Sequence, residues 1–203
     1  MFALQFIVQA QEELEKYRKS KHRELEKNKE QIAIFMRQKI FGAHSAVLYS
    51  FNLMEAYLNG LAWDHINSHD ISNFSNRKKK LLKDTYSVSI RKKLEKYPRI
   101  IAEKELWDVQ ENNEMLNAFL DIIKPFRDSL VHPSPFSAPE KFGGYDKLRL
   151  LYRIDFDTGI LTAKLLVLLV ELIHSHIYIE VDNLPKWFTE LKQEVEKALS
   201  LLN

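Results

Sequence analysis

The sequence predicts an all-α protein built from a few long helices, and three observations carry this prediction. Of the 203 residues, 45% are hydrophobic and 29% are charged, a composition typical of a globular chain. Only 5 glycines and 6 prolines are present, and so few turn-forming residues disfavour an all-β fold. Apolar residues recur at intervals of three and four, which places them on one face of a helix.

The first third of the chain is expected to form one or two very long helices, from about Ala10 to His65. Residues 11–31 are dense in Glu, Lys and Arg, and alternating charges of this kind suit an exposed helix. Apolar residues then become frequent and keep helical spacing. We therefore expect a charged helical extension over residues 1–31 and a folded domain over residues 32–203.

Shorter helices and loops are expected to follow. Residues 69–75 are polar and predict a loop, with Ser75 as the N-cap of the next helix. Residues 76–107 predict two or three short helices, with a boundary at Pro98. Residues 133–144, rich in proline and glycine, predict another loop.

The C-terminal part is expected to contain two further helices. The stretch from Tyr145 to Phe156 is ambiguous, and one short β-hairpin is a possible outcome there. A helix capped by Asp157 or Thr158 should then run to about residue 177. A last, C-terminal helix should carry Pro185 in its first turn.

The most regular apolar stripe lies between Glu114 and His132. It consists of Leu116, Phe119, Ile123, Phe126 and Leu130. Pro125 lies inside this stripe, and an interior proline removes a backbone hydrogen bond and costs about 3 kcal/mol. Because the stripe keeps its phase across the proline, we expect one kinked helix rather than two unrelated ones.

Composition excludes several classes of protein. The chain has no cysteine, which rules out disulfides, thiol nucleophiles and cysteine-bound zinc. The most apolar stretch, residues 160–173, is shorter than the roughly 20 residues that a membrane span needs. Residues 1–10 lack the basic leader and cleavage site of a signal peptide. We therefore expect a cytoplasmic protein without a membrane segment, and its net charge of +2 leaves only local patches to bind nucleic acid.

Arg127 and His132 close the predicted core helix and are the most chemically distinctive residues in the sequence. Positions five apart on an ideal helix lie about 7.5 Å apart along the axis and about 140° apart around it. Pro133 disfavours helical backbone at His132. The helix should therefore unwind at that point and allow the two side chains to approach each other.

A converging Arg127 and His132 would suit the cleavage of a phosphodiester bond. A histidine with a pKa near neutrality can exchange a proton, and a fixed arginine can stabilise the charge of a phosphorane. Attack by an RNA 2′-hydroxyl would need no metal ion or other cofactor. The alternative is purely structural: His132 would interact with the helix dipole, and Arg127 would pair with Asp128 or another acidic residue.

Two segments resemble the HEPN superfamily. Residues 120–136, LDIIKPFRDSLVHPSPF, look like its signature helix, in which a polar residue follows an arginine and a histidine comes a few positions later. Residues 49–63, YSFNLMEAYLNGLAW, are similar to an earlier core helix that often places an acidic or amide residue opposite the motif. In this sequence the residues that could take that place are Asn52, Glu55 and Asn59.

The resemblance implies both a fold and an activity. HEPN domains are helical bundles that usually form homodimers, and their catalytic members are metal-independent ribonucleases found among toxins, in defence and in RNA processing. By this resemblance His132 is the general acid and base, Arg127 binds phosphate, and Asp128 orients one of them. Glu55 is the acidic residue facing the motif. The implied partners are RNA, a second copy of the chain, and an antitoxin or another protein.

Two further functions stay open beside the ribonuclease. Pro133 replaces the glycine that follows the histidine in many active HEPN members, so the chain could be a HEPN-like binding or scaffold module without catalysis. It could also be a structural assembly protein. That function would use the long N-terminal helix and the apolar seam of the last helix, residues 191–202.

A basic run follows the first predicted loop and could hold RNA phosphates. It comprises Arg77, Lys78, Lys79, Lys80 and Lys83, joined later by Arg91, Lys92, Lys93, Lys96 and Arg99. Tyr86 and Tyr97 could offer stacking faces for bases. The alternative is an ordinary solvated helix face.

No metal site is predicted. His174 and His176 are two apart and would point away from each other on a helix, so they are interpreted as structural residues. His65 and His69 have the spacing of a zinc-binding pair, but the sequence offers no third ligand beside them.

Overall fold

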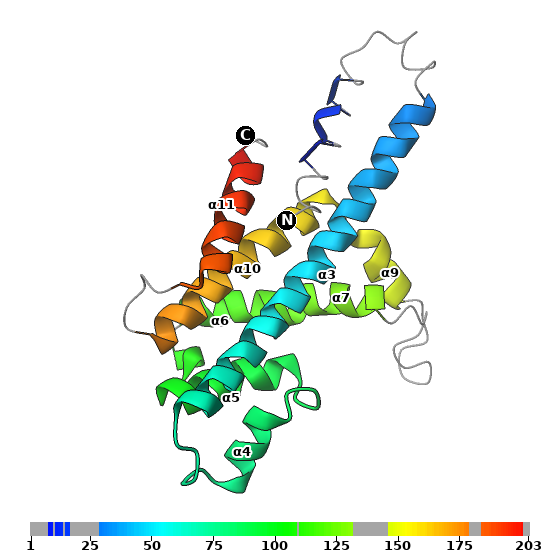
Figure 1. Ribbon diagram of the computed structural model, residues 1–203. Helices are drawn as coiled ribbons and strands as arrows, with labels where there is room; N and C mark the ends of the chain where they lie inside the picture. Colours follow the sequence, from blue (N-terminus) through cyan, green and yellow to red (C-terminus); the bar gives the residue numbers. More distant parts are fainter. Residues whose placement is uncertain are drawn as a thin grey trace.

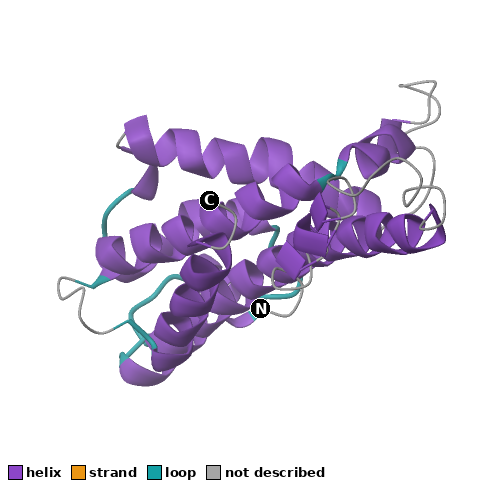
Figure 2. Ribbon diagram, turned by 90° about the horizontal axis from the view of Figure 1, so that it is seen from above, coloured by secondary structure: helices purple, strands orange, loops and turns teal. Residues whose placement is uncertain are grey.

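The computed structural model describes residues 8–9, 11–13, 15–16, 29–108, 110–131, 146–178 and 184–200. All regular secondary structure in these residues is helical (Figure 2), which confirms the predicted all-α class. His132, Pro133 and the predicted loop at residues 133–144 lie outside the described residues.

Helix α3, Lys29–Ser68, is the long N-terminal helix that the sequence predicts, and it spans 40 residues. It packs along α10, Phe156–Ile177 (Figure 1), and the two helices contribute most of the core. The fully buried residues on α3 include Val47, Met54 and Leu58. Burying each side chain of this size stabilises the fold by about 1.5–3 kcal/mol.

Two described residues of the N-terminal segment contact the rest of the protein. Val8 is buried in the core cluster, and Lys39 of α3 donates a hydrogen bond to Gln11 at 2.6 Å. Helix α3 begins at Lys29, so it crosses residues 31 and 32 without interruption.

The remaining helices cover this central pair (Figure 1). They are α4 (Asn76–Lys83), α5 (Ile90–Ala102), a short 3₁₀ turn (Leu106–Asp108), α6 (Gln110–Asn117), α7 (Lys124–Val131), α9 (Asp146–Arg153) and α11 (Lys186–Ser200). Phe188, Val195 and Ala198 of α11 are buried in the core, so this part of its apolar seam serves the domain itself. None of the described helices combines the length and apolarity needed to cross a membrane.

Helix caps were predicted with mixed success. Ser75 caps α4 as expected, because its side chain accepts a hydrogen bond from the backbone N–H of Lys78. Helix α10 is capped by Asp155, which accepts hydrogen bonds from the backbone and the hydroxyl of Thr158 at 2.9 and 2.7 Å. The predicted caps, Asp157 and Thr158, were therefore wrong by two or three positions.

Pro98 does not mark a helix boundary, contrary to the prediction. It lies inside α5, where Tyr97, Pro98 and Ile100 are all buried. Burial of three apolar side chains offsets the roughly 3 kcal/mol that an interior proline costs. The helix ends instead at Ala102, and the residue that follows, Glu103, has a left-handed φ of 57°.

The β-hairpin considered for Tyr145–Phe156 is wrong, because residues 146–153 form helix α9. Leu151 and Ile154 face the core together, which is the three-residue spacing of a helix rather than the two-residue spacing of a strand. Helix α9 packs against α7. The local sequence pattern of this segment is ambiguous, and the tertiary contact favours the helical conformation.

The helix around Pro125 is continuous, as predicted, but it contains a π-helical segment, Ala118–Ile123. The backbone N–H of Lys124 bonds to the carbonyl of Phe119, five residues earlier. Pro125 follows this wide turn directly. Because a π turn relocates the backbone hydrogen bonds, the proline is accommodated as the second residue of α7 without ending the helical run.

Three histidines are held in low-polarity surroundings. Burial lowers the pKa of His174, whose ring lies 3.2 Å from the Tyr57 hydroxyl. Burial, and then the charge of His69, lowers the pKa of His65. Burial also lowers the pKa of His44, partly opposed by a hydrogen bond with the backbone of Leu151. These rings are therefore neutral in the folded protein near pH 7.

We predict that the protein loses stability as the pH falls below about 6.5, the unfolded-state pKa of histidine. Below that pH the unfolded chain binds more protons than the folded one, so the free energy of unfolding declines. Each of these histidines adds at most about 1.4 kcal/mol per pH unit to the slope of the free energy of unfolding against pH. Because glutamine does not titrate, His174→Gln should make this slope less steep. Urea unfolding between about pH 7.5 and 5 measures both effects, and a stability that rises on acidification would contradict the burial argument.

Candidate functional site

Arg127 is held in a fixed position by an aromatic stack. Its guanidinium lies over the ring of Phe51 from α3, with the carbon centre 4.5 Å from the ring centroid. Phe51 in turn stacks on Phe119, with centroids 5.4 Å apart and planes at 9°. Both rings are buried, and 22% of the Arg127 side chain is exposed. The cation therefore sits at the surface end of a stack that begins in the core.

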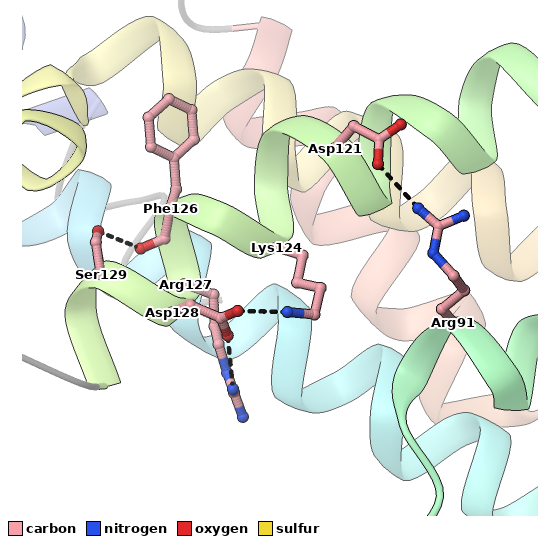
Figure 3. A network of polar contacts seen from close by, with 7 residues as sticks. All are labelled: Arg91, Asp121, Lys124, Phe126, Arg127, Asp128 and Ser129. Carbon is pink, nitrogen blue, oxygen red and sulfur yellow. Dashed lines mark hydrogen bonds and ion pairs between the residues drawn. The ribbon is translucent and has the colours of Figure 1, made fainter. Parts of the chain in front are cut away.

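Asp128 joins two cations on α7 (Figure 3). Arg127 Nη1 donates to one carboxylate oxygen of Asp128 at 3.0 Å, and Lys124 Nζ donates to the other. Burial opposes ionisation of Asp128, but the hydrogen bonds from Lys124 and Arg127 outweigh it and lower its pKa. The three side chains thus carry two positive charges and one negative charge, which leaves a net charge of +1 for an anion.

Arg127 also keeps an unused donor. Its Nε–H is buried and has no hydrogen-bond partner among the described residues. A buried donor without a partner costs about 1–3 kcal/mol, more for a charged group, and an oxygen acceptor at this place would recover it. A phosphate supplies such oxygens in the geometry that a guanidinium matches.

Ser129 adds a local side-chain hydrogen bond within the last turns of α7. This side chain is buried, and its hydroxyl donates to the carbonyl of Phe126 at 2.6 Å (Figure 3). The description of α7 ends at Val131, so His132 and its predicted approach to Arg127 lie outside the described residues.

Glu55 lies on α3 one turn beyond Phe51, on the same side of the helix. Its carboxylate accepts a hydrogen bond from Lys93 Nζ of α5 at 2.7 Å. The Lys93 side chain is only 1% exposed, whereas Glu55 is 32% exposed. Glu55 therefore neutralises a buried lysine, and a role opposite Arg127 stays a prediction.

Two other residues were considered for the position facing the motif. Asn52 is exposed on α3. Asn59 is half-buried, and its side-chain oxygen is buried without a hydrogen-bond partner among the described residues. Asn59 lies two turns beyond Phe51, so it belongs to a different part of the surface from Arg127.

The basic run on α4 is largely exposed. Arg77, Lys80 and Lys83 face solvent and have no ion-pair partner among the described residues. Lys78 lies 5.5 Å from the centroid of the Phe74 ring, and Lys79 donates to the carbonyl of Ser72 at 2.8 Å. A cationic surface on α4 is thus available to an anionic ligand.

The basic residues of α5 are mostly used within the fold. Arg91 pairs with Asp121 at 2.9 Å, Arg99 pairs with Glu105 at 2.7 Å, and Lys93 is buried. These three do not extend the free cationic surface of α4.

The two tyrosines expected to stack on bases differ in exposure. Tyr97 is fully buried, and its hydroxyl donates to the carbonyl of Leu81, so the expectation for Tyr97 is wrong. Tyr86 is fully exposed and remains available.

Two contributors to the Arg127 site were not predicted from the sequence. Lys124 shares Asp128 with Arg127, and its four-residue spacing from Asp128 is a signal that could have identified it. The contact between Phe51 and Arg127 spans 76 positions and has no local signal.

The described residues contain no cluster of three or more potential metal ligands. His65 and His69 stack with ring centroids 4.4 Å apart, and His65 also stacks on Phe74.

No model of a known protein family matches the chain, and no curated protein or solved structure was found to be similar to it.

We predict that the two partners of the buried ion pair respond unequally to substitution. Glu55→Ala leaves the Lys93 cation buried and unpaired and should cost about 3–5 kcal/mol. Lys93→Met leaves a carboxylate that water can reach and should cost less than about 1.5 kcal/mol. Urea unfolding followed by circular dichroism measures both.

Glu190→Ala is the matched control, because Glu190 pairs with Lys186 on the surface at 3.9 Å. Its effect should stay within about 0.5 kcal/mol. If Glu55→Ala were as mild as this control, Glu55 would not be fixed by Lys93, and a role toward the Arg127 site would gain support.

Proposed function

We propose that this protein is a HEPN-type RNA endonuclease that needs no metal ion. The observation that carries the proposal is Arg127, a cation stacked on Phe51, with a net positive neighbourhood and a buried, unused donor. This arrangement suits the negatively charged phosphate of a phosphodiester, and the exposed cations of α4 suit a longer polyanion. The order of helices is consistent with the resemblance of residues 49–63 and 120–136.

The proposed reaction is an internal transesterification. The 2′-hydroxyl attacks the adjacent phosphorus while His132 removes its proton, and the P–O5′ bond breaks. The departing 5′-oxygen takes up a proton from water, and the products are a 2′,3′-cyclic phosphate and a 5′-hydroxyl. Arg127 stabilises the charge on the phosphorane oxygens, and Asp128 positions the guanidinium.

The Arg127–Asp128 ion pair favours a second candidate, which is RNA binding without cleavage. Asp128 already occupies one edge of the guanidinium, so fewer donors face a phosphate than in a free arginine. Pro133 stands where many active HEPN proteins have a glycine. In this second candidate the same residues bind RNA but do not cleave it.

The N-terminal half of α3 supports the predicted homodimer as a further part of the proposal. It exposes several large apolar side chains: Ile34, Met36, Ile40 and Phe41. Ile34 and Phe41 lie on one side of the helix and Met36 and Ile40 on another, so they form two exposed apolar strips, and exposed apolar surface commonly marks an interface between proteins. The same strips are the observation that would favour a structural assembly protein if no RNA activity were found.

The proposal predicts cleavage of a mixed RNA pool in EDTA, with 2′,3′-cyclic phosphate ends. His132→Ala should lower the cleavage rate by about 10²–10⁴-fold, because the proton acceptor is lost. Arg127→Ala should lower it by about 10²–10³-fold, and Arg127→Lys should not restore it, because a lysine lacks the planar fork. Denaturing gels and end-group analysis measure the products.

Arg149→Ala is the matched control, since Arg149 is an exposed arginine on α9 and its loss removes the same charge. It should cleave like the wild type. RNA binding without cleavage by the wild type would establish the second candidate instead, and equal cleavage by wild type and Arg127→Ala would remove Arg127 from the mechanism.

A further inference from the structure

A groove crosses α3 two turns beyond the Phe51–Arg127 contact. It has a volume of about 530 Å³ and lies between the C-terminal half of α3 and the segment that ends α4 and follows it. The lining residues used below are Asn59, Gly60, Trp63, Asn67, Lys83 and Tyr86.

Two exposed aromatic side chains line this groove. Trp63 is 66% exposed and Tyr86 is fully exposed, and the groove brings the two together from α3 and from the segment after α4. The exposed faces contribute nothing to the core, and a planar ligand could stack on either ring. Base stacking on such rings is the usual way in which proteins hold unpaired nucleotides.

Gly60 opens the floor of the groove, and the fold does not require a glycine there. It lies in the interior of α3, where glycine is destabilising relative to alanine. A Cβ atom built at Gly60 would meet nothing within 4 Å. Neither a tight helix contact nor an unusual backbone angle therefore explains this residue. Its consequence is open space beside Trp63.

Asn59 supplies an unused acceptor next to Gly60. Its side-chain oxygen is buried and has no hydrogen-bond partner among the described residues. The amide of Asn67 on the same wall donates to the carbonyl of Trp63 at 2.8 Å and so is already engaged. A ring N–H or an exocyclic amine of a base would satisfy the Asn59 oxygen.

Charge at the mouth of the groove favours an anion. Lys83 lines the groove and is exposed, and Lys80 lies three residues before it on α4. The nearest carboxylate in sequence, Asp84, is ionised, because hydrogen bonds from Ser87 and the charge of Lys80 lower its pKa. It offsets the charge of Lys80 and leaves Lys83 as the cation of the groove. Asp64 is exposed on α3 but lines the neighbouring hollow on the other side of Gly60.

We propose that this groove binds an unpaired RNA base, which stacks on Trp63 and Tyr86 and donates a hydrogen bond to Asn59, while Lys83 binds its phosphate. The choice of RNA as the ligand rests on the proposed function. Gly60 is nine residues from Phe51, which is about 14 Å along α3 and about half a turn around it, so a strand that contacts both the groove and Arg127 has to pass around the helix. In this proposal the groove holds one part of the strand, and the Arg127 site acts on another.

The test measures fluorescence anisotropy of a labelled, unstructured, mixed-sequence RNA of about 12 nucleotides. The full chain carries His132→Ala so that the RNA stays intact. Adding Trp63→Leu or Tyr86→Leu should weaken binding by about 5- to 100-fold. Lys83→Ala should reduce the slope of log affinity against log salt by about 1.

Two further variants separate ligand binding from folding. Gly60→Leu should raise the melting temperature by about 2–4 °C, because leucine favours the helix, and yet weaken RNA binding by filling the groove. Tyr49→Leu is the matched control, since Tyr49 is a 63% exposed aromatic on the same helix away from the groove. Its RNA affinity should stay within about twofold of the parent.

The outcomes distinguish this inference from the proposed function. Unchanged RNA affinity in the Trp63, Tyr86 and Gly60 variants would show that the groove does not bind RNA, even if the wild type cleaves RNA. Weakened binding in these variants, with no cleavage by the wild type, would support RNA binding in the groove and contradict the proposed nuclease activity. Failure of the His132→Ala parent to bind RNA would overturn both.

Discussion

The packing of α3 along α10 is the constraint on which the rest of the structure depends. Helix α3 is about 60 Å long, and the side-chain contacts described above take their positions from their places along it. The Phe51 ring packs against the Arg127 guanidinium, Glu55 forms an ion pair with Lys93, and the Tyr57 hydroxyl contacts the His174 ring. Gly60 and Trp63 then open the groove. A change in the contact between α3 and α10 would move all of these together.

One buried cation and a partly exposed group of charges pack around α3, and both have local ion-pair partners. Lys93 is almost completely buried and is compensated by Glu55, while Lys124 and Arg127 share Asp128. Ion pairs of this kind add little net stability because desolvation offsets attraction, but losing one partner is costly. The difference between the two sites is their balance: one cation meets one anion at Glu55, and two cations meet one anion at Asp128. Only the second retains a net charge that could attract a ligand.

The sequence predicted much of the fold because helical periodicity is a local property. The long apolar pattern of α3, the cap at Ser75 and the continuous run across Pro125 were all predictable from neighbouring residues. The errors arose where burial outweighed a local signal. Pro98 lies inside α5 because three apolar residues around it are buried. The segment after residue 145 is a helix because its apolar residues pack beside α7.

By itself, the sequence determined the all-α class, the long helix α3, and the residue types that give α7 its charge and its chemistry. These follow from composition, spacing and side-chain identity, which need no knowledge of distant neighbours. Only the tertiary structure decided that Arg127 lies on Phe51, that Glu55 is engaged by Lys93, and that Tyr97 is buried while Trp63 is exposed. These contacts join positions far apart in the chain, and their energies depend on burial, which no local pattern specifies.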